Sequence, residues 1–118
     1  METQIQTLLK TIKNDYFDHT LRGRSETELS EINRTMIQEF NDNITINEGQ
    51  KYIKIITGNG GGQRVWGFVV NTNTDKKFQR GDILKAASWA APARNKPRGN
   101  ILKDDFSWVR WTGPEYLK

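Results

Sequence analysis

The segment from Ala86 to Arg98 (AASWAAPARNKPR) combines one tryptophan with three cations that alternate along the chain. In an extended chain, residues two apart point the same way, so Arg94, Lys96 and Arg98 are expected to share a side. Cations that follow phosphates and aromatic rings that stack on bases are the usual basis of single-strand binding. Together with the cations just before it, the segment predicts a nucleic-acid-binding site made of Lys76, Lys77, Arg80, Lys85, Trp89, Arg94, Lys96 and Arg98.

The same residues have a second interpretation, in which Trp89 anchors the loop to the core and the cations only keep it solvated. Pro92 and Pro97 remove backbone donors, so a long regular strand is not expected here. The two interpretations differ in the exposure of Trp89 and in the direction of the cations, and the sequence alone does not decide between them.

Residues suited to acid–base or metal chemistry are sparse. The chain has no cysteine, which excludes disulfides and thiolate nucleophiles, and its single histidine, His19, excludes a site of several histidine ligands. Asp82 follows Gly81 in an expected turn. Asp104 and Asp105 could bind Mg²⁺ with substrate phosphates, but turn capping is the commoner role. We therefore expect a non-catalytic protein without a cofactor or a bound metal.

The glycine-rich stretch 58–62 invites comparison with a phosphate-binding loop. It lacks the G-x-x-x-x-G-K-[ST] spacing, and a strand rather than a helix is expected to follow it. The stretch is therefore expected to form the tip of a hairpin.

Charge divides the 118-residue chain into two unlike parts. Residues 1–50 carry 5 Lys+Arg and 9 Asp+Glu, whereas residues 51–118 carry 13 and 5, so net charges of −4 and +8 add to the overall +4. All four tryptophans lie in the basic part. This asymmetry predicts an interaction surface on the basic part. We divide the chain into an N-terminal helical segment, 1–43, and a small β-barrel-like domain, 44–118.

The acidic part is predicted to form two helices. The first has apolar residues at i, i+3, i+4 and i+7, and these are Ile5, Leu8, Leu9, Ile12 and then Tyr16. Gly23 can adopt the positive φ needed to leave a helix. Ser25 and Glu28 have the spacing of a capping box for the second helix. Its apolar face comprises Leu29, Ile32, Met36, Ile37 and Phe40.

Both apolar stripes are expected to pack against each other or against a sheet. A dimer seam or a groove for a partner is the alternative, so a homo-oligomer formed through these helices stays open. The stripes by themselves do not distinguish these arrangements.

The basic part is predicted to form short strands separated by turns. The expected β segments are 44–46, 51–57, 64–71, 99–103 and 107–112, and residues 78–84 are expected to form a turn that enters a short strand. Such a series predicts an α+β fold in which the helical pair precedes a mostly antiparallel barrel or curved sheet, SH3-like or OB-like. Strand alternation places Trp66 with Phe68, Trp108 with Arg110, and Val109 with Trp111, and at least two tryptophans should be core.

Six stretches of the basic part form a distinctive series: KYIK at 51–54, VWGFV at 65–69, FQRGDIL at 78–84, KAASWAAPARN at 85–95, RGN at 98–100 and VRWTG at 109–113. Over about residues 51–117 they resemble a family of small, uncharacterised tailed-bacteriophage proteins. The resemblance implies a phage-encoded protein in the cytoplasm of an infected bacterium, but it implies no activity and no residue roles.

We expect a binding module for single-stranded DNA or RNA. A protein-interaction module that modifies a host protein during infection is one alternative, and a minor virion component is another. The N-terminus METQIQTLLK lacks a basic region followed by an apolar run, and no apolar run is long enough to cross a membrane. A cytoplasmic protein that does not contact the membrane is therefore expected.

Overall fold

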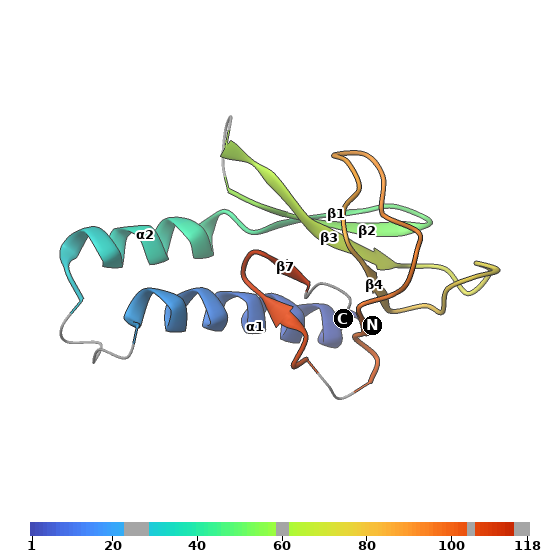
Figure 1. Ribbon diagram of the computed structural model, residues 1–118, viewed down its shortest axis with the longest axis horizontal. Coiled ribbons are helices and arrows are strands. Elements are labelled where there is room, and N and C mark those ends of the chain that lie inside the picture. The colour runs from blue at the N-terminus through green and yellow to red at the C-terminus, as the bar shows by residue number, and fades with distance from the viewer. Residues whose placement is uncertain (23–28, 59–61, 104–105, 115–118) are drawn as a thin grey trace.

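The computed structural model describes residues 1–22, 29–58, 62–103 and 106–114. Two helices, α1 (Glu2–Leu21) and α2 (Glu31–Asp42), precede a five-stranded antiparallel sheet and a two-stranded one. The larger sheet contains β1 (Thr45–Glu48), β2 (Tyr52–Thr57), β3 (Arg64–Val70), β4 (Asp82–Leu84) and β5 (Gly99–Asn100), and the smaller contains β6 (Val109–Arg110) and β7 (Gly113–Pro114). The α+β class and the N-terminal helical pair are confirmed. In Figure 1, α1 runs along one side of the sheet and α2 extends beyond its end.

The larger sheet is an open meander, in which each strand pairs with its sequence neighbour. Neither sheet closes into a barrel, so the prediction of an SH3-like or OB-like barrel is wrong. The last strands are too short to return to β1, because β4 and β5 pair over two residues each. The chain instead turns toward α1, where the Trp111 N–H donates to the Asp15 carboxylate at 2.8 Å.

The strands after β3 agree with the prediction only in part. Over 78–84 the predicted turn and short strand are confirmed, because a hydrogen bond of 3.1 Å from the Asp82 N–H to the Gln79 carbonyl closes a turn just before β4. The single strand predicted over 107–112 is a tight hairpin, in which β6 and β7 pair through Arg110 and Gly113. The predicted hairpin around the glycine-rich stretch is confirmed, because β2 and β3 are antiparallel partners.

Helix α1 is stabilised because its apolar stripe packs against the sheet. Ile5, Leu8 and Ile12 are all buried against the sheet. The helix ends at Arg22, whose left-handed backbone (φ 51°, ψ 41°) lets its N–H donate to the Asp18 carbonyl. The predicted exit residue, Gly23, lies outside the described residues.

Helix α2 begins at Ser30, the N-cap residue. Its hydroxyl accepts a hydrogen bond of 3.1 Å from the Asn33 N–H, which satisfies one of the unpaired donors of the first turn. The capping box predicted from Ser25 and Glu28 lies outside the described residues.

The apolar face of α2 is largely uncovered. Ile32 and Met36 are 73% and 46% exposed, so the prediction that both pack against the rest of the chain is wrong. Phe40 makes the main contact at the other end of α2, where it stacks on Tyr16 of α1 with ring centroids 4.1 Å apart. The C-terminal end of α2 therefore docks on the C-terminal part of α1, and the first turns of α2 leave apolar side chains exposed.

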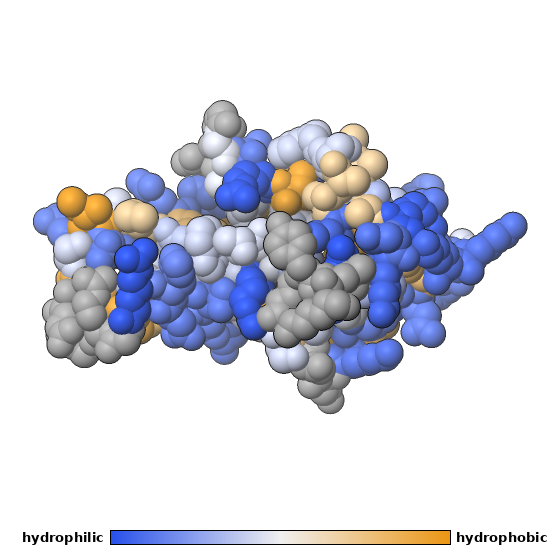
Figure 2. Space-filling view, in the orientation of Figure 1, coloured by the Kyte–Doolittle hydropathy of each residue, from blue (hydrophilic) through white to orange (hydrophobic). Residues whose placement is uncertain are grey.

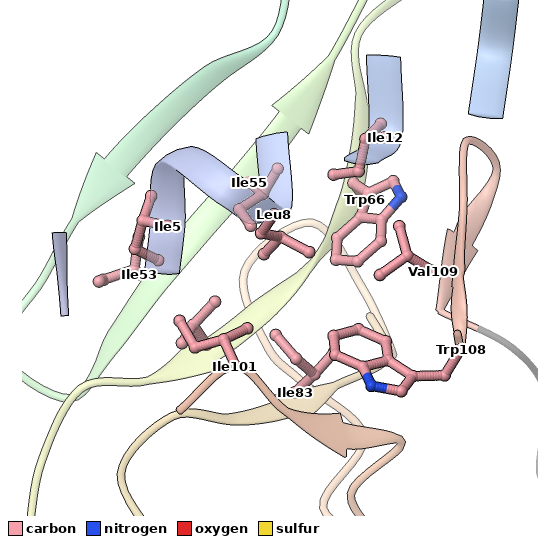
Figure 3. Packing of buried hydrophobic residues seen from close by; sticks show 11 residues of the cluster. Ile5, Leu8, Ile12, Ile53, Ile55, Trp66, Ile83, Ile101, Trp108 and Val109 are labelled. Atoms are coloured by element: carbon pink, nitrogen blue, oxygen red, sulfur yellow. The ribbon is translucent and has the colours of Figure 1, made fainter. Parts of the chain in front are cut away.

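The main core lies between α1, one face of the sheet and the β6 hairpin (Figure 3). Two of the four tryptophans, Trp66 and Trp108, are buried there, which confirms the expectation of at least two core tryptophans. The buried members are Ile5, Leu8, Ile12, Ile53, Ile55, Trp66, Val69, Ile83, Ile101, Trp108 and Val109.

A β-bulge decides where Trp66 points. The register between β2 and β3 shifts between Ile55 and Ile56, which leaves Trp66 as an extra residue in β3. Trp66 consequently packs in the main core, where its indole N–H donates to the Arg110 carbonyl at 2.7 Å, while Phe68 packs on the opposite face. The prediction that Trp66 and Phe68 share a face is therefore wrong.

The prediction for Trp108 and Val109 is also wrong. They were assigned to opposite faces of one strand, but both pack in the main core. Trp108 lies in the turn before β6, so strand alternation does not apply to it. Trp111 lies against Tyr16 of α1, with ring centroids 5.0 Å apart, and it also packs against the main core.

The second face of the sheet carries a smaller apolar cluster. Its buried members are Phe68, Val70, Phe78 and Leu84, and Tyr52, Val65 and Ala86 pack around them. No helix covers this face in the described part of the chain, and its cover is the segment between β4 and β5 (Figure 1).

The packing of Trp108 on β5 gives a stability prediction. A Cβ at Gly99 would overlap the indole ring of Trp108, which is held in the main core. Gly99→Ala should therefore lower the free energy of unfolding by about 1–3 kcal/mol, as overpacking does elsewhere. Gly62→Ala is the matched control, because a Cβ there meets no atom within 4 Å. Urea unfolding curves that coincide for the two variants would contradict this packing.

Candidate functional site

The segment between β4 and β5 forms a small hairpin over the second face of the sheet. Ala86 and Pro92 form an isolated antiparallel bridge, and the Ala93 N–H donates to the Lys85 carbonyl at 2.7 Å. The N–H groups of Ala87 and Ser88 both donate to the Ala91 carbonyl, which closes the tip. Trp89 lies at this tip.

Trp89 is half exposed and rests on a lysine. Its side chain is 50% exposed, and the Lys54 ammonium lies 4.1 Å from the ring centroid. Lys54 pairs across β2 and β3 with Phe68, which places it on the second face. Of the two interpretations of Trp89, core anchoring is wrong. The ring is instead half exposed, with the Lys54 ammonium over it in a cation–π contact.

Arg94 fastens the hairpin to the rest of the chain. Its guanidinium donates to the Asp75 carboxylate at 3.0 Å and to the Tyr52 hydroxyl, and it lies 4.8 Å from the Phe78 ring centroid. The Lys77 ammonium, from the β3–β4 segment, donates to the Arg94 carbonyl of the hairpin. Arg94 is therefore a positioning residue that ties the β3–β4 segment, β2 and the hairpin together.

Asp75 is the acidic partner in this arrangement, and its side chain is only 1% exposed. The hydrogen bond from Arg94, followed by those from the N–H groups of Lys77 (2.8 Å) and Phe78 (3.0 Å), holds the pKa of Asp75 well below its usual value. The carboxylate consequently stays charged and remains bound to Arg94 at physiological pH.

Beside Arg94 lies an open pocket of about 490 Å³ between the β1–β2 turn and the β3–β4 segment. It is rich in donors, and its lining residues are Gln50, Lys51, Thr72, Thr74, Asp75, Lys76 and Arg94. Because Arg94 and Asp75 neutralise each other, Lys51 and Lys76 give the pocket a net positive charge. Neither lysine forms an ion pair within the described residues.

The structure brings only some of the predicted site residues to this region. Lys76, Lys77, Trp89 and Arg94 lie on or beside the second face. Arg80 lies with the N-terminal end of α1, in a pocket that also contains Glu2 and Glu48.

The remaining predicted cations lie elsewhere. Lys85 lines a different pocket with Arg64 and Arg110, and Arg98 lines one with Trp108. Lys96 is exposed and follows the bend at Asn95.

The alternation predicted for Arg94, Lys96 and Arg98 is not realised. The chain bends at Asn95, whose side-chain oxygen accepts from the Lys96 N–H at 2.8 Å. The Arg98 N–H then donates to the Ile83 carbonyl, which draws this residue back toward β4. The expectation that the three cations share a side is therefore wrong, because the loop is not extended.

Lys51 and Lys54 are site residues that the sequence reasoning missed. Lys54 alternates along β2 with Ile53 and Ile55, which are buried in the main core. The alternation itself indicated that Tyr52 and Lys54 face away from that core. What the sequence did not indicate is that the Trp89 hairpin folds over this face.

The described residues contain no group of three or more side chains suited to hold a metal ion. Asp82 lies at a turn, as expected, and its carboxylate accepts from the Gln79 N–H at 2.9 Å and from the Asn100 amide at 2.9 Å. His19 is exposed at the end of α1, and Asp104 and Asp105 lie outside the described residues. No helix in the described ranges has the length and apolar character needed to cross a membrane.

Comparison with known proteins places the chain in a family. One family model matches residues 1–116, which include both helices and both sheets. The chain belongs to DUF7717, a family of unknown function. The matched residues include α1 and α2, and the family assigns neither an activity nor a phage origin. Searches of the curated proteins and of the solved structures found no match.

The Arg94–Asp75 pair gives a pH prediction. Because folding lowers the pKa of Asp75, the pair stabilises the chain above the unfolded pKa of about 3.8, and this contribution is lost as the pH falls through the lower folded pKa. Asp75→Asn keeps the shape of the side chain but removes its charge. The variant should be less stable than the unaltered chain at pH 7, and the difference should shrink below about pH 4. Chemical unfolding at several pH values measures this, and a constant difference would contradict it.

Proposed function

We propose that this DUF7717 protein binds nucleic acid through a surface on the second face of its sheet. We call this surface the Trp89 face and define it by Lys51, Tyr52, Lys54, Lys76 and Trp89. The observation that carries the proposal is the half-exposed Trp89 ring with Lys54 at 4.1 Å, next to a pocket with net positive charge. A stacking ring beside cations is what a nucleic-acid strand requires of a protein.

The charge distribution supports the same face. The basic part carries a net charge of +8, and β2, the Trp89 hairpin and the β3–β4 segment all belong to it. Such a field attracts phosphates from a distance and raises the rate of encounter. In Figure 2, hydrophilic side chains gather around the β3–β4 segment at the right of the view.

Arg94 supports binding indirectly under this proposal. Its guanidinium is engaged by Asp75 and Tyr52, so it holds the loop and leaves phosphate contacts to the lysines. Reversing its charge would place two carboxylates together and disturb the loop. Arg94 variants therefore test folding of the loop, and variants of the Trp89 face test binding.

Substitution of Trp89 is the direct test. Trp89→Ala should weaken the binding of labelled single-stranded oligonucleotides by about 1–3 kcal/mol, because it removes the stacking ring. Trp89→Phe is the matched control and should retain most of the affinity. Titrations at two salt concentrations should also show that affinity falls with salt, with a log–log slope of about −0.7 per phosphate contacted. An absence of saturable binding by the unaltered chain at low salt would disprove the proposal.

The resemblance at 51–117 supports a narrower version of the proposal, in which the protein is phage-encoded and works in the cytoplasm of the infected bacterium. Its partner would then be phage or host DNA or RNA. Recovery of nucleic acid crosslinked to the protein from infected cells would test this version.

A protein partner is the second candidate, and the exposed apolar residues of α2 favour it. Ile32 and Met36 are one helical turn apart, so they form one exposed strip. Figure 2 shows hydrophobic atoms over α2 at the left of the view.

Changing Ile32 and Met36 to Gln should abolish capture of a partner that survives nuclease treatment of a host lysate. Thr35→Gln, a change at an exposed position of the same helix, should not affect that capture. Capture that is equal in both variants would contradict this second candidate.

A further inference from the structure

The pocket beside Arg94 has the chemistry of an anion site. Lys51 and Lys76 supply ammonium groups, Gln50 supplies an amide, and Thr72 and Thr74 supply hydroxyls that are hydrogen-bonded to each other at 2.9 Å. The only carboxylate in its lining, that of Asp75, is buried and already accepts hydrogen bonds from Arg94 and two N–H groups. The pocket thus presents donors and positive charge to solvent, which suits a phosphate.

Both walls of the pocket are tied in place. On the β1–β2 side, Asn71 donates through its N–H to the Lys51 carbonyl at 2.8 Å and through its amide to the Gly49 carbonyl at 2.9 Å. On the β3–β4 side, the Thr74 N–H donates to the Thr72 hydroxyl at 3.2 Å. Walls that are already held lose little freedom when an anion binds.

Both the pocket and the Trp89 ring are tied to β2. Tyr52 contacts Arg94, which lines the pocket, and Lys54 contacts Trp89. These two strand residues share a face, and their Cα atoms are about 7 Å apart at the usual rise of a strand. A single strand that follows this face of β2 would therefore meet both the pocket and the ring.

We infer that this pocket is the phosphate subsite of a single-strand-binding surface, and that it holds the backbone phosphate next to the base stacked on Trp89. The inference rests on the proposed function and specifies its ligand. A base can stack on Trp89 only when its own π-face is open, and pairing and stacking inside a duplex cover that face. Single strands are therefore the preferred class of ligand.

Lysine variants of the pocket provide the test, with a labelled single-stranded oligonucleotide as the probe. Lys51→Ala and Lys76→Ala should each weaken binding by about tenfold, the loss expected for one charged hydrogen bond. The double variant should lose less than the product of the two single losses, because both lysines contact one phosphate. Lys10→Ala, an exposed lysine on α1, is the matched control and should bind like the unaltered chain. Lys76→Arg should retain the affinity.

Inorganic phosphate is the second probe. At matched ionic strength it should displace the oligonucleotide from the unaltered chain more effectively than chloride does, and this difference should vanish in the double variant. A duplex of the same sequence should bind more weakly than the single strand.

The outcomes separate the two proposals. If Trp89→Ala loses affinity while the lysine variants bind like Lys10→Ala, the phosphate subsite is disproved and the proposed function stands. Losses that multiply in the double variant disprove a single shared phosphate, and equal affinity for duplex and single strand disproves the ligand class. If the unaltered chain binds no oligonucleotide, both proposals fail.

Discussion

An open sheet with apolar side chains on both faces must be covered twice, and the rest of this structure depends on how that is done. Helix α1 and the β6 hairpin cover one face and form the main core. No other helix of the described residues covers the second face, because α2 docks beyond the end of the sheet and has no buried side chain of its own. The second face is covered by a loop, and a loop needs fastening because it lacks regular hydrogen bonding.

The Arg94–Asp75 pair supplies that fastening and shapes the candidate site. It joins three segments that are distant in sequence, and Asp75 neutralises the charge of Arg94 in the pocket lining. The other cations that line the pocket are Lys51 and Lys76, and the exposed tryptophan is the one at the hairpin tip. Fastening the loop thus falls to Arg94 and Asp75, and the neighbouring lysines of the lining take no part in that ion pair.

Much of the fold follows from local patterns that the sequence displays. The 3-4-7 spacing of Ile5, Leu8 and Ile12 predicted α1, and the β-rich runs predicted β2 and β3 as a hairpin. The sequence did not show whether the sheet closes into a barrel, since closure depends on whether the last strands are long enough to reach β1. The face of Trp66 was mispredicted because a bulge breaks the two-residue alternation, and a bulge is a property of a strand pair.

The candidate site likewise combines features that follow from the sequence with features that follow only from the fold. Composition and charge order determined by themselves that the basic part, 51–118, carries a net charge of +8 and all four tryptophans, because charge is additive along the chain whatever its conformation. Only the tertiary structure decided that Arg94 faces Asp75, that Arg80 and Arg98 lie elsewhere, and that Lys54 lies against Trp89. Those assignments depend on how a loop folds back over a distant strand, and the contacts that direct it join residues far apart in the chain.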